Sequence, residues 1–224
     1  MKARLVSVHV GRIRTHGTPG ATDPLERQWS TAYFKDPVEG PRHLGLEGLE
    51  GDEQRDYGRG HGGPEMAALM YSADHYPAWR EELKIPEMSF GGFGENLVVE
   101  GLVESSVCIG DTFEVGEAIV QVSCPRGPCS NIAKRWHRPD MVKRVTANGR
   151  TGWYLRVKQE GLVAAGDDLA LTDRPNPLWT VARVFRARVE PERDPAAVRE
   201  LTELPLLDPA WHGKFRKLAA ALAK

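Results

Sequence analysis

Short apolar runs separated by glycine turns fill the chain from Gly91 to Leu171, and this pattern constrains the fold more than any other feature. Each run is long enough for one short strand, and the Gly116-Glu117 pair is a plausible hairpin turn between two of them. Many short strands joined by tight turns are typical of a β-barrel or a strongly coiled sheet. The runs that fit strands are residues 96–99, 112–115, 118–123, 153–158 and 169–171.

The first 60 residues combine one predicted strand with a long polar segment. Residues 1–14 alternate apolar and polar side chains, as a strand with one buried face does. Residues 15–60 are crowded with Gly and Pro, and such a stretch without regular structure is usually functional or disordered. Order is favoured by residues 35–38, which fit the end of a strand, and by residues 45–52, whose Gly51-Asp52 pair is interpreted as a turn.

Helical patterns occur in three places in the middle of the chain. The first predicted helix begins at Pro64, which suits a first helical position, and continues through Met70. The second covers residues 72–83. The third begins after Asp140 as its N-cap and ends near Asn148-Gly149, while the segment directly after Cys129 is interpreted as an irregular turn.

The last third of the chain changes character, because three segments each open with an Asn-Pro or Asp-Pro pair. An Asn or Asp side chain accepts free backbone N–H groups at a helix start, and Pro fits the first turn. The sequence therefore predicts an α+β, β-rich chain with a β-barrel domain at residues 1–174 and a three-helix module at residues 175–224. The predicted caps are Asn176, Asp194 and Asp208.

Composition excludes several classes of function. The formal net charge is −1, so no overall basic field points to nucleic acid, and basic residues of the three-helix module are interpreted as solvated faces. The sequence has neither a secretory signal nor an apolar run that spans a membrane, so a cytoplasmic location is expected. The three cysteines show neither zinc spacing nor a disulfide framework.

The string Cys124-Pro125-Arg126-Gly127-Pro128-Cys129 follows a predicted strand and carries the strongest chemical signal. Two prolines around an arginine stiffen the backbone, so the loop can present one thiol with little entropy to lose. A nearby guanidinium favours the thiolate, which attacks electrophiles or binds a soft transition metal. Cys129 is therefore either a functional thiol or an inert one, and Cys108 and Cys124 are interpreted as buried thiols.

Two glycine-rich segments are weaker candidates. His61 precedes Gly62-Gly63, so it either binds a ligand and shuttles protons or is simply a loop residue. Residues 91–94 contain three glycines but match no phosphate-binding motif, and the following Glu95-Asn96 pair has an equally plausible role in turn hydrogen bonds.

Taken in order, these pieces resemble the MOSC domain, which is named after the C-terminal domain of molybdenum cofactor sulfurases. With the three-helix tail, nearly the whole chain is similar to the bacterial YiiM-like branch of that family. The family fold is a β-barrel with flanking helices. The strings that carry the resemblance are Lys35-Asp36-Pro37-Val38, Gly48-Leu49-Glu50-Gly51-Asp52, His61-Gly62-Gly63-Pro64, Phe93-Gly94-Glu95-Asn96-Leu97, Pro125-Arg126-Gly127-Pro128-Cys129 and Gly149-Arg150-Thr151-Gly152-Trp153-Tyr154.

The resemblance implies a molybdenum–pterin cofactor (molybdopterin) with Cys129 as the molybdenum ligand. His61 is the expected proton donor, and Cys124 stands where the family pattern leads us to expect a polar residue. Further residues in or beside the motifs are expected to line the cofactor pocket: Lys35, Arg59, His61, Asn96, Arg126 and Arg150. Arginine, lysine and glycine amides suit the phosphate of such a cofactor.

The resemblance also implies reduction of N-hydroxylated compounds, including hydroxylaminopurine base analogues, as a detoxification. Electrons would come from a separate reductase, while the cofactor supplies the redox chemistry and the protein supplies orientation and charge. By analogy the chain is also expected to form a homodimer. Two other interpretations stay open: a non-catalytic carrier of the cofactor or its sulfur, and a metal-free thiol enzyme or sensor that uses the nearby Cys124.

Overall fold

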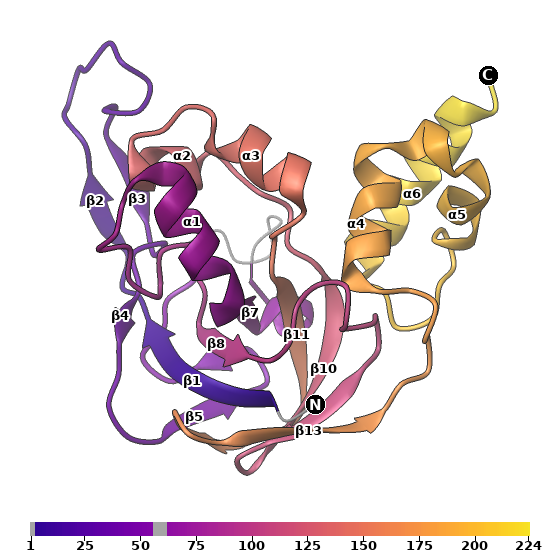
Figure 1. Cartoon of the computed structure of the whole chain (residues 1–224), viewed down its shortest axis with the longest axis horizontal. Helices are drawn as coiled ribbons and strands as arrows, with labels where there is room; N and C mark the ends of the chain where they lie inside the picture. Colours follow the sequence, from indigo (N-terminus) through magenta and orange to yellow (C-terminus); the bar gives the residue numbers. More distant parts are fainter. Residues whose placement is uncertain (1–2, 56–61) are drawn as a thin grey trace.

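Seven strands close into a barrel in the computed structural model, which describes residues 3–55 and 62–224 (Figure 1). Neighbouring strands pair antiparallel except β7 and β8, and the pairing of β13 with β1 closes the ring. In ring order the strands are β13 (Asp168–Asp173), β9 (Thr112–Val115), β10 (Ala118–Pro125), β11 (Trp153–Gln159), β7 (Ala68–Ser72), β8 (Leu97–Glu100) and β1 (Ala3–Val10). The barrel expected from the glycine-spaced strands is confirmed.

The β9–β10 hairpin turns at Gly116-Glu117, and Val115 pairs with Ala118 across it. The pairing of β10 with β11 shifts register between Val122 and Cys124. Such an irregularity bends a strand and re-aims the residues that follow. The bend therefore lies directly before the loop that carries Cys129.

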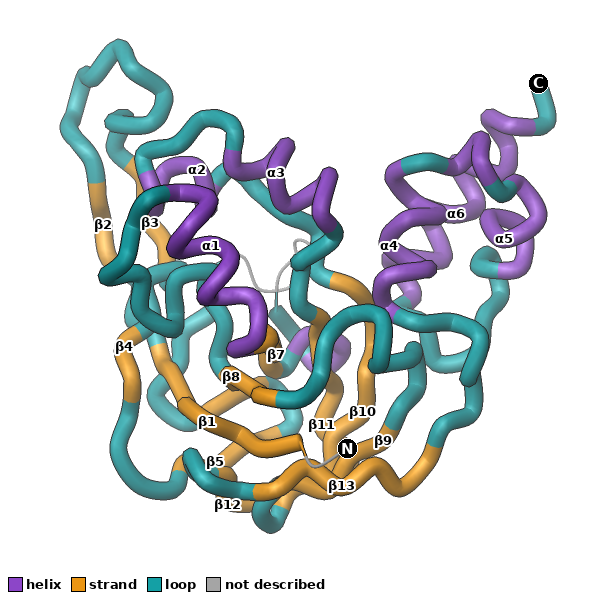
Figure 2. The backbone as a smooth tube through the Cα atoms, viewed as in Figure 1, coloured by secondary structure: helices purple, strands orange, loops and turns teal. Residues whose placement is uncertain are grey.

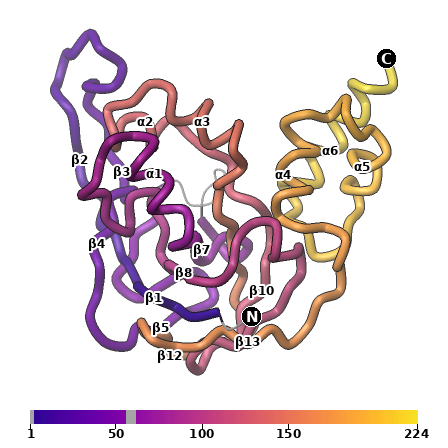
Figure 3. Tube along the Cα trace, in the orientation of Figure 1, coloured from indigo at the N-terminus to yellow at the C-terminus, as the bar shows by residue number. Residues whose placement is uncertain are grey.

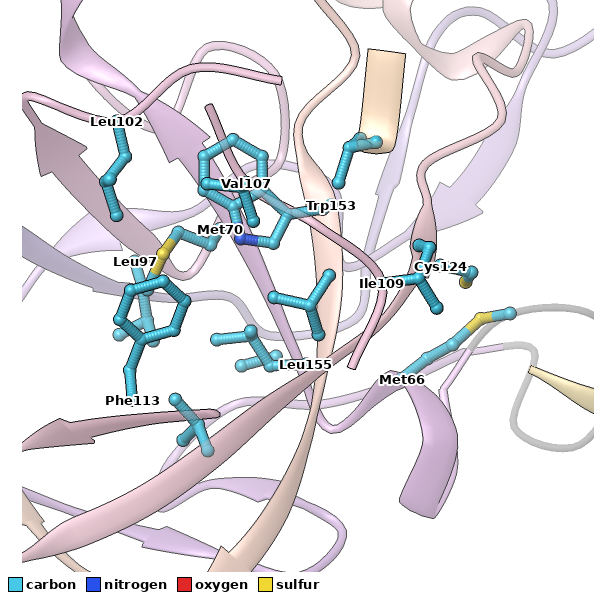
Figure 4. Packing of buried hydrophobic residues seen from close by; sticks show 14 of the residues in the cluster. Met66, Met70, Leu97, Leu102, Val107, Ile109, Phe113, Cys124, Trp153 and Leu155 are labelled. Atoms are coloured by element: carbon cyan, nitrogen blue, oxygen red, sulfur yellow. The ribbon is translucent and has the colours of Figure 1, made fainter. Parts of the chain in front are cut away.

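The barrel interior is filled by alternate side chains of these strands. Trp153 and Leu155 of β11 are completely buried, as are Leu97 of β8 and Val120 of β10. Figure 4 shows Trp153, Leu155 and Leu97 gathered with Met70 between the strands. Burying one such side chain typically contributes about 1.5–3 kcal/mol, so this cluster dominates the stability of the barrel.

Helices on one side of the barrel enclose a second core. They are α1 (Tyr76–Leu83), which follows a 3₁₀ turn at Ala73–His75, α2 (Asn131–Trp136) and α3 (Met141–Asn148). Figure 2 shows the three helices grouped apart from the C-terminal helices. The buried rings of Tyr71 and Phe93 stack in this core with their centres 4.5 Å apart. The second and third predicted helices are thus confirmed at the residues of α1 and α3.

The helix predicted from Pro64 is wrong. One 3₁₀ turn ends at Met66, and the chain then enters strand β7, which is buried along its whole length between β11 and β8. A continuous apolar run does not distinguish a fully buried strand from a helix, which explains the error. The predicted capping by Asp140 is also wrong, since its carboxylate accepts a hydrogen bond from Arg144 and makes no capping bond.

The polar segment of the first 60 residues is ordered where the structure describes it. Strand β4 (Asp36–Pro37) pairs with the end of β1, and β5 (Arg42–Gly45) pairs with β6 (Gly48–Leu49) and β12 (Gly161–Val163). Strands β2 (Arg14–His16) and β3 (Trp29–Thr31) form a separate hairpin that projects from the barrel (Figure 3).

The C-terminal module contains α4 (Val181–Val189), a 3₁₀ turn (Pro191–Arg193), α5 (Pro195–Glu200) and α6 (Pro209–Leu222). Asp194 and Asp208 cap α5 and α6, because their carboxylates accept hydrogen bonds from Ala197 N and Trp211 N at 2.9 Å. The predicted first cap is wrong: Thr180 caps α4, while the Asn176 amide donates to the carbonyl oxygens of Ile109 and Pro205. Across residues 3–55 and 62–224, the helices are too short or too polar to cross a membrane.

Replacing Asp194 by alanine is expected to lower the free energy of unfolding by about 1 kcal/mol, because the first turn of α5 loses its side-chain acceptor. Urea unfolding of the full chain measures this change. Asp140→Ala is the matched control, since Asp140 also precedes a helix but makes no capping bond, and its effect should be smaller than that of Asp194→Ala. Equal losses in both variants would contradict the assignment of Asp194 as a cap.

Candidate functional site

One pocket opens between residues 31–35, residues 52–55 and the Cys129 loop, by which we mean residues 126–130. Its interior measures about 110 Å³, and the empty space rises to about 680 Å³ when the open mouth is included. The side chains that shape its chemistry are Tyr33, Lys35, Asp52, Arg126, Cys129 and Tyr154.

The Cys129 loop joins the end of β10 to α2. The N–H of Arg126 donates to the carbonyl of Gly152 at 3.1 Å. Because Gly152 directly precedes β11, this bond fixes the start of the loop beside that strand. Cys129 itself is half-buried, is not in a disulfide and faces the pocket. The irregular turn expected after it is wrong, because α2 begins at Asn131, only two residues later.

The C-terminal module reaches the other side of this loop. A Cβ atom placed on Gly127 would lie 2.9 Å from Nη1 of Arg188, which belongs to α4. The Arg188 guanidinium lies over the Trp211 ring of α6, with its Cζ 4.8 Å from the ring centre. The absence of a side chain at residue 127 therefore leaves room for Arg188 between the loop and the module.

Arg126 is a buried cation at the back of the pocket, only 3% exposed. Its Nη2 donates to the Tyr33 hydroxyl at 3.1 Å, but its Nη1 is buried without a hydrogen-bond partner among the described residues. Burial lowers the pKa of Arg126, while Tyr33, Cys129 and Tyr154 raise it, and the balance lies above the ordinary value. The pocket thus holds a permanent positive charge with an unused donor.

Tyr33 and Tyr154 flank this arginine as neutral phenols. Burial raises the pKa of Tyr154 to about 12, although the Arg126 charge opposes the shift. Burial likewise raises the pKa of Tyr33, again against the effect of Arg126. Both hydroxyl groups therefore keep their protons near neutral pH and leave the charge of Arg126 unneutralised.

Lys35, Asp52 and Asn96 form a buried polar cluster in the pocket lining. The Lys35 ammonium pairs with Oδ1 of Asp52, and the Asn96 amide donates to Oδ2 of Asp52 at 2.9 Å. The N–H of Gly11 donates to the same carboxylate at 2.6 Å. Burial lowers the pKa of Lys35 and the Asp52 charge opposes this shift. Asp52 therefore holds three separate segments of chain in place.

The Asn96 side chain also ties the strands together. Its Oδ1 accepts from Leu69 N at 3.2 Å, and its amide donates to the His9 carbonyl at 3.3 Å as well as to Asp52. Asn96 lines the pocket, but its polar atoms are used within the protein.

Comparison with known proteins matches the barrel and the C-terminal helices to two family models. A family model described as the MOSC domain matches residues 57–170, and one described as the YiiM-like, 3-alpha helix domain matches residues 179–220. The uncharacterized protein YflK of Bacillus subtilis (strain 168) is 38% identical over 201 residues, which cover 90% of each chain. The chain belongs to the MOSC-domain family.

Two further relatives extend the comparison. The crystal structure of YiiM from Geobacillus stearothermophilus superposes with a TM-score of 0.80 at 30% identity, and the alignment covers 97% of this chain and 99% of that one. A protein of Gibberella moniliformis (strain M3125 / FGSC 7600) named "Reductase" is 36% identical over 208 residues, which cover 91% of this chain but only 35% of the relative. The family and the barrel-plus-helices fold expected from the ordered motifs are confirmed.

Four of the expected site residues meet in the pocket, namely Lys35, Asn96, Arg126 and Cys129. Arg150 does not line it: the guanidinium pairs with Glu82 at 2.8 Å, stacks over Trp79 and faces a different hollow beside α4. Of the motif Gly149–Tyr154, it is therefore Tyr154 that lines the pocket. Arg59 and His61 lie outside the described residues.

The Gly91–Asn96 turn is held by hydrogen bonds to Glu95, which was one of the two interpretations of this segment. The Glu95 carboxylate accepts hydrogen bonds from Gly91 N at 2.8 Å, from Phe93 N at 2.9 Å and from the Tyr76 hydroxyl. These three hydrogen bonds occupy both oxygens of the Glu95 carboxylate and hold the loop in place. The segment positions Gly94 and Asn96 in the pocket wall without supplying a free carboxylate.

Cys124 and Cys129 have different surroundings. Cys124 is completely buried, lies outside the pocket lining and has a pKa raised by burial. Cys129 is half-buried within that lining. Only Cys129 is therefore placed to meet a ligand.

Sequence reasoning missed Tyr33, Asp52 and Tyr154 as pocket residues. Thr31, Ala32, Tyr33 and Lys35 all line the pocket, so a strand period of two does not single out Tyr33. Asp52 had been interpreted as a turn residue, and nothing local shows that it meets Lys35. Among the described residues, groups of three or more His, Cys, Asp or Glu that could hold a metal are absent.

Proposed function

We propose that this chain holds a molybdenum–pterin cofactor through Cys129 and reduces N-hydroxylated compounds, such as hydroxylaminopurine base analogues, to detoxify them. The observation that carries the proposal is one accessible thiol in a pocket whose wall contains a buried arginine with an unused donor. Membership of the MOSC-domain family supports the choice of cofactor.

The residues of the pocket fit such a cofactor. A thiolate at Cys129 is a soft ligand that suits a transition metal. Arg126 would bind an anionic oxygen or sulfur through its free Nη1, because charge-assisted bonds to a guanidinium are strong and directional. The inner space of about 110 Å³ is too small for a whole pterin, so a bound cofactor would extend into the open part of the pocket.

The cofactor, when bound, would supply the two-electron chemistry that cleaves an N–O bond. The overall reaction converts a hydroxylamine, two electrons and two protons into an amine and water. The chain would orient the substrate, and the neutral phenols of Tyr33 and Tyr154 keep protons at the pocket wall. His61 stays a proposed proton donor on the basis of its motif alone.

The electrons would come from a separate reductase. The Gibberella protein named "Reductase" supports this, since the matching segment is 35% of its length and leaves room for further domains. A cytoplasmic location fits the three free cysteines, because disulfides are rare in that compartment. Location, partner and the expected homodimer remain predictions.

Turnover by cofactor-loaded protein tests the proposal. Full-length chain expressed in a host that makes the cofactor should contain molybdenum and pterin, and with a reductase partner it should convert 6-N-hydroxylaminopurine to adenine. The product can be measured by chromatography. Protein that loads and releases the cofactor but never produces adenine would instead be a carrier, and protein without molybdenum or pterin would point to a thiol enzyme.

A further inference from the structure

A second pocket lies between the β2–β3 hairpin and α2, and it shares no lining residue with the pocket of Cys129. Its interior measures about 530 Å³, within the range of small-molecule sites. The residues that give it its character are His16, Leu25, Trp29, Phe34, Lys134 and Arg135. Neither the family motifs nor the proposed reduction uses any of them.

Two unpaired cations face this pocket. The Lys134 ammonium lies 4.9 Å from the centre of the Trp29 ring, and Cζ of Arg135 lies 4.4 Å from the centre of the Phe34 ring. Within residues 3–55 and 62–224, ion pairs to Lys134 or Arg135 are absent, and Glu26 is the single carboxylate in the described lining. Moreover, Nε of Arg135 is buried without a hydrogen-bond partner. The pocket therefore has a surplus of positive charge and an unused donor.

Aromatic rings form the rest of the wall. His16 stacks on Phe34 with ring centres 4.0 Å apart and an angle of 18°, and Trp29 lies 6.0 Å from each of these rings. Nε2 of His16 is buried and has no partner among the described residues. Flat aromatic side chains beside arginine are the surroundings that single nucleobases prefer, because a base can stack on them irrespective of its identity.

We propose that this second pocket binds a nucleoside monophosphate. Lys134 and Arg135 hold the phosphate, since a guanidinium fork and an ammonium match its oxygens and no described carboxylate neutralises them. Trp29 and His16 contact the base, while Phe34 supports them from behind, because His16 and Arg135 already cover its two faces. Inorganic phosphate alone would leave most of a cavity of about 530 Å³ empty, which favours a ligand with a ring attached to the anion. The site stands independently of the proposed reduction.

Calorimetric titration of the full-length chain tests this site with AMP, adenosine and inorganic phosphate as separate ligands. AMP should bind saturably and at least tenfold more tightly than either fragment. Arg135→Gln and Lys134→Gln should each weaken AMP binding by roughly 10–100-fold, the range expected for loss of one charged hydrogen bond. Trp29→Leu should weaken AMP and adenosine but not phosphate.

Arg144→Gln is the matched control, since Arg144 lies on the neighbouring helix α3, is exposed and pairs with Asp140 outside the pocket. Its AMP affinity should equal that of the unaltered chain, and circular dichroism of each variant should show unchanged folding. Arg135→Lys, which keeps the charge, should retain more affinity than Arg135→Gln. Absence of AMP binding, equal affinity in all variants, or far tighter binding of a single-stranded oligonucleotide would overturn the proposal. None of these measurements requires molybdenum or turnover.

Discussion

If Cys129 holds the metal as proposed, Cys129→Ser is expected to fold normally and to be purified without molybdenum. Serine is nearly isosteric with cysteine, but its hydroxyl is a hard and weakly acidic ligand, whereas a soft metal prefers thiolate. We expect metal content to fall by more than roughly tenfold, because losing only an outer partner of a metal ligand already costs 10–100-fold in affinity. Elemental analysis of purified protein, with pterin fluorescence beside it, measures the effect.

Cys124→Ala is the control for this experiment. Its thiol is completely buried away from the pocket, so its removal should leave molybdenum content unchanged. Urea unfolding of Cys129→Ser should differ from that of the unaltered chain by no more than about 0.5 kcal/mol, since the side chain is half-buried in a loop. A Cys129→Ser protein with full molybdenum content would show that the metal is held elsewhere.

Asp52→Ala is expected to lower the free energy of unfolding by roughly 3–5 kcal/mol, because it leaves the buried Lys35 ammonium unpaired. The same change removes the acceptor of Gly11 N and of the Asn96 amide. Since these groups line or support the pocket, cofactor content should fall together with stability. Urea unfolding at neutral pH measures the first effect and metal analysis the second.

Two companion variants separate the cost of the unpaired Lys35 charge from the general effect of removing a carboxylate. In Lys35→Met/Asp52→Ala the unpaired charge is removed, so part of the lost stability should return. Asp36→Ala removes an exposed carboxylate that pairs with Arg14, and its effect should stay within about 1 kcal/mol. If Asp52→Ala were as mild as Asp36→Ala, the buried cluster would not stabilise the pocket wall.

The sequence predicts best those elements whose signals are local. The hairpin at Gly116-Glu117 and the caps at Asp194 and Asp208 depend on neighbouring residues, and all three are confirmed. The helix expected after Pro64 failed because β7 is buried on both faces, and only its tertiary neighbours β11 and β8 make it a strand. Asn176 failed as a cap because distant carbonyl groups compete for its side chain.

The candidate site was predictable only through the ordered motifs. They brought Cys129, Arg126, Lys35 and Asn96 to one pocket, although these residues are spread over more than ninety positions of the sequence. The spacing of these residues in the sequence does not predict that they meet, because the folding of the barrel brings them together. Arg150 shows the converse: it lies in a matching motif, yet its side chain pairs with Glu82 and lines a different pocket.

Arg188 and Gly127 bring the C-terminal module against the loop that carries Cys129. A side chain larger than hydrogen at residue 127 would displace the Arg188 guanidinium, whose flexible stem can yield, from its place over Trp211. A substitution at residue 127 would thus alter one contact between the module and the Cys129 loop, while the shared apolar core still joins the two parts of the chain. In a MOSC barrel without such a module, the constraint on residue 127 would disappear.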